Sequence, residues 1–147
     1  MPLDFHHLAL LVVRIGIVSP YSLTSPGGVQ TQVLGLARAL SVLGHQVRVL
    51  GPCDGAPPET GVTPLGASIP TFANGSIAPI APDLACTLRT IRAFRDEEFD
   101  VIHIHEPICP GPCQTALFMR SAPIVGTWHA AGGSKAYLTP GVRWLAT

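Results

Sequence analysis

The sequence is poor in charged residues and in aromatic residues. Charged residues make up 12% of its 147 positions and aromatic residues 6%, whereas about 25% of a typical globular domain is charged. Nine basic and nine acidic side chains give a formal net charge of zero, so there is no basic stripe of the kind that nucleic-acid binding requires. With 47% hydrophobic residues, the chain is also too apolar to be disordered. The composition predicts a folded domain that does not bind nucleic acid.

Cysteines and long apolar segments are scarce as well. Four cysteines are too few for a disulfide scaffold and indicate free thiols in a reducing compartment. The apolar run 8–13 stops at Arg14, far short of the roughly 20 residues of a membrane span. No basic segment precedes that run, as one would in a signal peptide. We therefore expect a cytoplasmic protein whose contact with a membrane, where it has one, is peripheral.

Glycine and proline, at fifteen residues each, divide the chain into segments of alternating strand and helix character. Short apolar runs predict strands at 14–19, 46–50, 67–72, 99–105 and 122–129. Helical spacing of apolar residues predicts helices at 29–43, 83–95 and 112–119, and a last helix beginning around Pro140. The turn-rich segment 52–66 is expected to be a loop. This alternation predicts an α/β fold with a doubly wound, Rossmann-like parallel sheet.

Ligands of such folds bind at the carboxyl ends of the strands, and the first candidate there is a glycine turn. Gly27 and Gly28 separate the first strand from the first helix. Adjacent glycines let a ligand approach the backbone closely, and the free N–H groups at a helix start attract anions such as phosphate. A tight turn with no ligand is the alternative on the pattern alone.

Histidines supply the second and third candidates. His103 and His105 face the same side of their strand because they are two residues apart, and with Cys109, Cys113 or His129 they offer zinc ligands by residue type. His103, however, lies deeper in the strand, where a hydrogen-bonded core histidine is usual, and we expect no metal. His129 closes the last strand and can donate a hydrogen bond or act as an acid or base. Anchoring of the following loop is the alternative role for His129.

Several motifs in one order resemble family 4 glycosyltransferases, and most closely the actinobacterial phosphatidylinositol mannosyltransferases. The motifs are RIGIV at 14–18, PYS at 20–22, PGGVQ at 26–30, LGHQV at 43–47, NGS at 74–76, FDVIHIHEP at 99–107 and WH at 128–129. The resemblance implies the GT-B architecture, in which two Rossmann-like domains face each other across a cleft. Residues 14–147 would be the amino-terminal, acceptor-side domain and residues 1–13 an irregular extension. The carboxy-terminal donor domain of that family has no counterpart in the sequence.

The same resemblance implies an activity and a set of site residues. Family members transfer a hexose with retention of configuration and without a metal or other cofactor. Here the donor would be a nucleotide-sugar, GDP-mannose, and the acceptor a lipid or polyol such as phosphatidylinositol. His129 matches the histidine that contacts the donor sugar and is needed for transfer. The resemblance assigns donor or acceptor binding to Gly27, Gly28, Gln30, Asn74, Glu106 and Lys135, with Gln30 lining the cleft.

The sequence departs from the family at positions that hold the acceptor phosphate. The basic residue that follows the NGS turn is missing, and Pro79 lies near its place. Ser134 occupies the place of a family lysine, and Lys135 follows one position later. These departures leave the identity of the acceptor open.

Arg89, Arg92 and Arg95 recur every three residues near the end of the second predicted helix. They could face anionic lipid. The alternative is that they only stabilise the carboxyl end of the helix, with their charge cancelled by the acidic run 96–98.

Two classes of function follow from the sequence. Transfer requires groups from both GT-B domains held in one geometry, so the 147-residue chain alone is expected to be inactive and the full-length form to be a glycosyltransferase. The alternative is a truncated Rossmann-like binding domain without catalysis. A metal-dependent hydrolase built on the His103–His105 pair is a third and more distant possibility.

Overall fold

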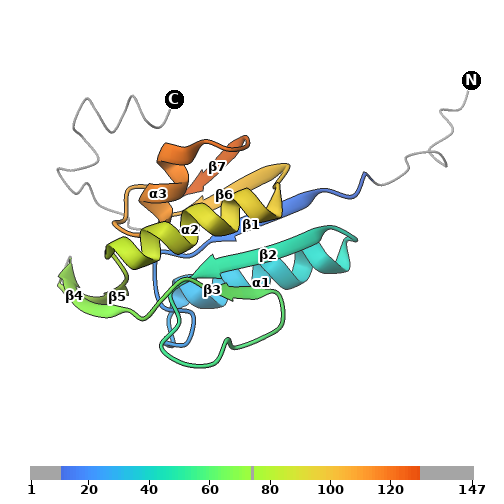
Figure 1. Cartoon of the computed structure of the whole chain (residues 1–147). Coiled ribbons are helices and arrows are strands. Elements are labelled where there is room, and N and C mark those ends of the chain that lie inside the picture. The colour runs from blue at the N-terminus through green and yellow to red at the C-terminus, as the bar shows by residue number, and fades with distance from the viewer. Residues whose placement is uncertain (1–10, 74, 130–147) are drawn as a thin grey trace, which may run out of the picture.

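The computed structural model describes residues 11–73 and 75–129 (Figure 1). The elements are β1 (Arg14–Val18), α1 (Gly28–Val42), β2 (Gln46–Gly51), β3 (Val62–Pro64), β4 (Ile69–Ala73), β5 (Ser76–Ile80), α2 (Leu84–Glu97), β6 (Val101–His105), α3 (Pro112–Met119) and β7 (Ile124–Thr127). The helix predicted around Pro140, and the candidate residues Asn74 and Lys135, lie outside the described residues. No helix in the described ranges has the length and apolar character needed to cross a membrane.

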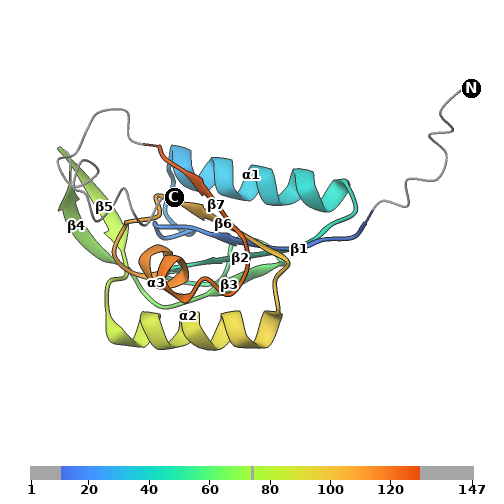
Figure 2. The same cartoon turned by 90° about the horizontal axis from the view of Figure 1, so that it is seen from above.

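A five-stranded sheet with the order β3-β2-β1-β6-β7 forms the centre of the fold. All four strand pairs are parallel, and Figure 2 shows α1 on one face with α2 and α3 on the other. The predicted doubly wound, Rossmann-like α/β fold is confirmed. The three predicted helices within the described residues are confirmed as well, each to within two residues at either end.

Two apolar cores, one on each face of the sheet, hold the layers together. Ile15 and Ile17 of β1 pack with Val33 of α1 on one face. Val18 of β1 and Ile104 of β6 pack with residues of α2 and α3 on the other. Because β1 is covered on both faces, it must be apolar along nearly its whole length, which is the pattern seen in the sequence.

The segment between β2 and α2 differs from the prediction in two ways. Part of the predicted loop 52–66 is β3, which extends the edge of the sheet beside β2. The predicted strand at 67–72 exists as β4, but it lies outside the main sheet and pairs antiparallel with the unpredicted β5. Pro79 obscured β5 in the sequence because proline is uncommon inside strands. The NGS turn noted in the sequence contains an Asn-Gly dipeptide, which favours two-residue hairpins, but no strand was predicted after it.

Candidate functional site

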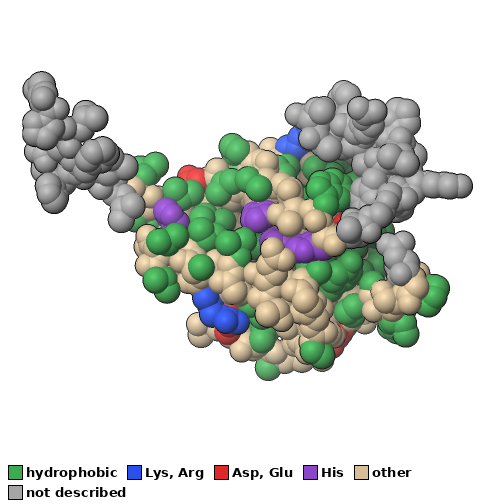
Figure 3. Space-filling model, turned by 180° about the vertical axis from the view of Figure 1, so that it is seen from behind, with side chains coloured by type: hydrophobic (Ala, Val, Ile, Leu, Met, Phe, Trp, Pro, Cys, Tyr) green, Lys and Arg blue, Asp and Glu red, His purple; other side chains and the backbone are tan. Residues whose placement is uncertain are grey.

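Three histidines form a row at the carboxyl edge of the sheet. His103 and His105 lie on β6, and their rings stack with centroids 4.4 Å apart, which confirms that they share one face of the strand. The β6–β7 register pairs His105 with Thr127, so the chain brings His129 alongside as it leaves β7. The rings of His105 and His129 lie nearly in one plane, with centroids 5.0 Å apart and an interplanar angle of 15°. Figure 3 shows histidine side chains gathered on this face of the molecule.

Each of the three histidine rings lies within hydrogen-bonding distance of a polar atom. The Nδ1 atom of His105 lies 2.7 Å from Nε2 of His129, and Nε2 of His103 lies 2.7 Å from Oγ1 of Thr127. Burial lowers the pKa of His105 to about 3, and the charges of the two other histidines add to this effect. Burial and the charge of His129 also lower the pKa of His103. His105 is therefore neutral at physiological pH.

The expectation that His103 is the core histidine was wrong, because His105 is the fully buried one and His103 is only half-buried. The carboxyl end of β6 is covered by the start of α3, where Gly111, Pro112 and Cys113 are all buried. The thiol of Cys113 donates to the carbonyl of His105 at 3.1 Å. Burial along β6 therefore increases toward its carboxyl end, so His105 is more buried than His103.

Glu106 holds the backbone that carries His129. It follows β6 with a positive φ of 52°, a conformation that costs a non-glycine residue about 1–2 kcal/mol. Its Oε1 atom accepts the backbone N–H of His129, and its own N–H donates to the carbonyl of Thr127 at 2.8 Å. Strained residues of this kind cluster at functional sites. The carboxylate thus positions the end of β7.

The glycine turn lies at the same edge of the sheet. Gly27 has an extended φ of 175° and precedes α1, whose first residue is Gly28. A Cβ on Gly28 would meet nothing within 4 Å, and no side chain of the described residues caps the helix. The amino end of α1 therefore presents backbone N–H groups and a positive helix dipole to an anion.

Gln30 supports this turn from inside. Only 6% of the residue is exposed, and Nε2 donates to the carbonyl of Ser22 at 3.3 Å. A Cβ on Gly27 would lie 2.3 Å from Oε1 of Gln30, so glycine leaves room for the amide. The resemblance implies that Gln30 lines the cleft between two domains; within this domain the residue is buried beneath the turn and bonds to the loop after β1.

Tyr21 lies in the loop that leads from β1 to the glycine turn. Burial raises the pKa of its hydroxyl, and the charges of Cys109 and Glu106 raise it further. Parallel pairing of β1 with β6 places the loop after β1 and the turn after β6 at the same edge of the sheet. The histidine row and the glycine turn therefore belong to one region of the molecule.

Asp54 ties three segments together beneath the loop, and the sequence did not reveal it. Its carboxylate accepts hydrogen bonds from the hydroxyl of Ser22 at 2.5 Å and from the N–H and hydroxyl of Ser68 at 2.6 and 2.8 Å. Its own N–H donates to the hydroxyl of Thr24 at 3.0 Å. These partners are distant in sequence, so no local pattern connects them.

We expect Asp54→Asn to destabilise the chain by roughly 1 kcal/mol at pH 7, because an exposed carboxylate loses part of its charge-assisted hydrogen bonding. The bonds from Ser22 and Ser68 lower the pKa of Asp54 below its ordinary value. Its contribution is therefore complete above about pH 4 and is lost as the pH falls through the folded-state pKa. Urea unfolding at pH 7 and at about pH 3 should show the difference between wild type and variant narrowing in acid.

The control for Asp54 is Glu59→Gln, which removes an exposed ion pair between Glu59 and Arg38 at 3.0 Å. Exposed ion pairs of this kind contribute about 0–1 kcal/mol to the free energy of unfolding, so this control should change stability little. If Asp54→Asn were as stable as wild type at pH 7, the carboxylate would not stabilise the loop.

The possible zinc ligands are engaged in other contacts. His103 and His105 bond to Thr127 and His129, and the Cys113 thiol points to backbone carbonyls. Burial, followed by the charge of Glu106, raises the pKa of Cys109 to about 12, whereas zinc binds thiolates. Within residues 11–73 and 75–129, no three His, Cys, Asp or Glu side chains are grouped as metal ligands.

A Rossmann-like sheet with a glycine turn before its first helix and a histidine after its outer strand agrees with the amino-terminal GT-B domain that the sequence motifs imply. The chain belongs to Glycosyltransferase Family 4, whose sequence profile matches residues 26–147. This finding confirms the family that the motifs suggested.

Three similar proteins bear the name phosphatidyl-myo-inositol mannosyltransferase. The one from Mycobacterium leprae is 43% identical over 121 residues, covering 81% of this chain and 32% of that protein. The one from Propionibacterium freudenreichii is 38% identical over 127 residues, with 81% and 33% covered. The one from Mycobacterium tuberculosis H37Rv is 37% identical over 129 residues, with 86% and 34% covered. The chain thus spans about a third of the length of these relatives.

Proposed function

We propose that the natural full-length polypeptide is a retaining glycosyltransferase that transfers mannose from GDP-mannose to a lipid or polyol such as phosphatidylinositol. Residues 14–147 form its acceptor-side domain. The observation that carries the proposal is the placement of His129, held by His105 and Glu106 at the same sheet edge as the open start of α1. Membership of Family 4 and the names of the relatives support the sugar and the acceptor.

The two parts of the site suit the charges that sugar transfer creates. The bond from the anomeric carbon to the diphosphate breaks, the acceptor oxygen forms the new bond, and the acceptor proton leaves with the diphosphate. Negative charge grows on the departing diphosphate, and the N–H groups at Gly27 and Gly28 would stabilise it. The His129 imidazole would donate a hydrogen bond to the donor sugar and orient it.

The test is a transfer assay of the natural full-length polypeptide with GDP-mannose and phosphatidylinositol vesicles. We expect a lipid product one hexose heavier, with the anomeric configuration of the donor as read by NMR. UDP-glucose replaces the donor in one control, and soluble inositol phosphate replaces the lipid in another, so the two arms separate donor from acceptor choice. Binding of nucleotide-sugar without transfer to any acceptor would instead favour the non-catalytic binding domain.

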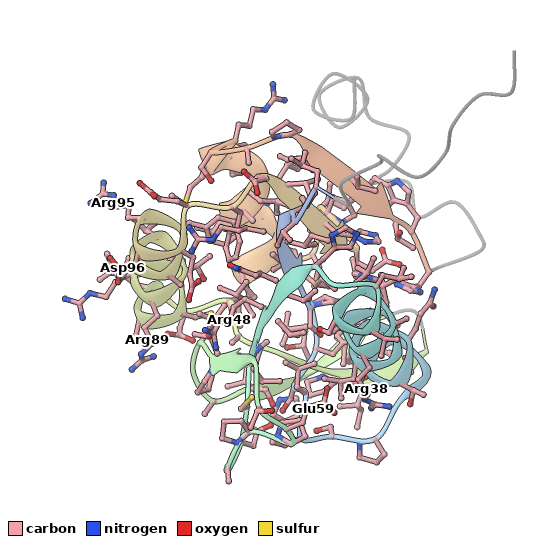
Figure 4. The ribbon with its side chains drawn as sticks, turned by 90° about the vertical axis from the view of Figure 1, so that its right-hand side faces the viewer. Arg38, Arg48, Glu59, Arg89, Arg95 and Asp96 are labelled. Atoms are coloured by element: carbon pink, nitrogen blue, oxygen red, sulfur yellow. The ribbon has the colours of Figure 1, made fainter. Side chains whose placement is uncertain are left out.

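We further propose that α2 contacts anionic lipid at the cytoplasmic face of the plasma membrane. Figure 4 shows Arg89, Arg95 and Asp96 on the outer side of this helix. Leu84 and Leu88 are exposed there by 72% and 57%. Basic residues beside exposed leucines are typical of interfacial helices. An open hollow of about 550 Å³ on this face is lined by Leu88, Arg89, Ile91, Arg92, Arg95 and Asp96.

The acidic run 96–98 follows the three arginines of α2. It neutralises less of their positive charge than their closeness in the sequence suggests. Glu97 forms ion pairs with Arg48 at 3.2 Å and with Arg14 at 3.8 Å. Its carboxylate therefore balances two cations of β1 and β2 rather than those of α2. This contact favours lipid binding over the purely stabilising role of the helix arginines.

Replacing Arg89, Arg92 and Arg95 together with glutamine should lower the partition coefficient onto phosphatidylinositol-containing vesicles by roughly 100-fold, since each basic residue near an anionic surface contributes about 1 kcal/mol. Flotation with the natural full-length polypeptide measures the bound fraction. Arg38→Gln, on α1 at the other face of the sheet, is the control and should bind nearly as wild type. Equal binding of the triple variant and wild type would rule out contact through α2.

A further inference from the structure

His105 has a property that its packing does not explain, because one of its ring nitrogens is buried without a partner. The residue has no exposed surface, and Nε2 makes no hydrogen bond to any described residue. Its other nitrogen, Nδ1, lies 2.7 Å from Nε2 of His129. A fully buried imidazole with only one partner is costly, and the partner here is the histidine at the candidate site.

The unpartnered nitrogen decides where the proton of His105 resides. A neutral imidazole has one N–H donor and one acceptor nitrogen. A proton on Nε2 would leave a buried donor without an acceptor, whereas a proton on Nδ1 is donated to His129 and leaves only a lone pair unpaired. Buried donors without partners are rarer in proteins than under-satisfied acceptors. The arrangement therefore favours the proton of His105 on Nδ1.

The tautomer of His105 determines that of His129. Since Nε2 of His129 accepts the hydrogen bond, a neutral His129 must carry its own proton on Nδ1. The ring is also held in place, because it is nearly coplanar with the His105 ring, at an interplanar angle of 15°, and its backbone N–H is bound by Glu106. His129 thus presents a donor at Nδ1, the nitrogen that His105 does not occupy.

We propose that His105 is a positioning residue that fixes His129 in the Nδ1–H tautomer, so that a hydrogen-bond donor faces the ligand. This inference rests on the proposed function only for the identity of that ligand, the donor sugar. The low pKa of His105 supports it, because a neutral His105 keeps a single proton to donate. His103 plays no such part, since its Nε2 bonds to Thr127.

The direct test is the protonation of the His129 ring, read from two-bond ¹H–¹⁵N correlation spectra of ¹⁵N-histidine-labelled full chain. We expect the Nδ1–H tautomer in the wild type. In His105→Phe, we expect a shift toward the Nε2–H form that neutral histidine prefers in water. His103→Asn is the matched control and should retain the wild-type tautomer. An Nε2–H form in the wild type would overturn the proposal, and this spectrum decides the matter even where His105→Phe does not fold.

A second readout separates positioning from packing and from the proposed function. With GDP-mannose, His105→Phe should lower kcat on the order of 100-fold, the cost of a misoriented group, and leave the KM for the donor nearly unchanged. His105→Asn, which can still donate an N–H to His129, should recover part of kcat. If wild type shows no transfer but the tautomers behave as expected, the proposed function fails and the positioning role stands. A folded His105→Phe variant with unchanged tautomer and kcat would contradict the role itself.

Discussion

Substitution of His129 with alanine is expected to reduce transfer by the natural full-length polypeptide on the order of 100-fold in kcat. The reason is that His129 is proposed to orient the donor sugar through a hydrogen bond, and misplacement of a reacting group costs on the order of 100-fold in rate. His129 is held in position for this role, since its ring is bonded to His105 at 2.7 Å and its backbone to Glu106. Initial rates with GDP-mannose, fitted for kcat and KM, measure the loss.

The matched control is His45→Ala. His45 directly precedes β2 and therefore lies at the opposite, amino edge of the parallel sheet. Its Nδ1 atom accepts the backbone N–H of Val13 at a long 3.4 Å, so its loss should leave kcat unchanged. A His129→Ala enzyme that is folded and as active as wild type would remove His129 from the mechanism. His129→Ala removes the hydrogen-bond partner of the buried His105. Circular dichroism is therefore used to check that the variant is folded.

The fold was predictable where the apolar pattern decides the structure. β1 is covered on both faces, so burial imposes an apolar run that can be recognised in the sequence. Asp83 caps the start of α2: its side chain accepts the N–H of Cys86 at 2.9 Å, a local signal of a helix start. The β4–β5 hairpin, by contrast, packs outside the main sheet, and its prolines Pro70 and Pro79 face each other in the register. Which sheet a short strand joins is a tertiary property that its own sequence does not contain.

The site was predictable in its residue types but not in its contacts. Glycine at the start of α1 and a histidine after β7 follow from general rules for α/β sheets and from the family motifs. The buried state of His105 depends on α3 covering the end of β6, and Cys113, which makes that contact, was considered only as a possible ligand. Asp54 bonds to Ser22 and Ser68, 32 and 14 residues away. Contacts of this range are set by the folded topology, so sequence spacing could not reveal them.

The backbone at Gly111 has little conformational freedom. It precedes α3 with φ of 111° and ψ of −138°, a region that is nearly restricted to glycine. A Cβ there would lie 2.6 Å from the carbonyl oxygen of Ala81 and 3.1 Å from its carbon. Both atoms belong to the backbone, so no side-chain rotation can relieve the contact. The start of α3 therefore packs directly on the segment that joins β5 to α2.

Gly111→Ala should lower the free energy of unfolding by about 2–6 kcal/mol, the sum of the conformational strain and the overpacking. Urea denaturation of the chain at pH 7 measures it. Gly55→Ala is the control, because a Cβ on Gly55 meets nothing within 4 Å, and it should change stability by less than about 1 kcal/mol. Since α3 also covers His105, the loss should extend to the histidine row, and the His105 ring resonances should broaden or shift. A Gly111→Ala chain as stable as Gly55→Ala would show that α3 can move away from Ala81 without cost.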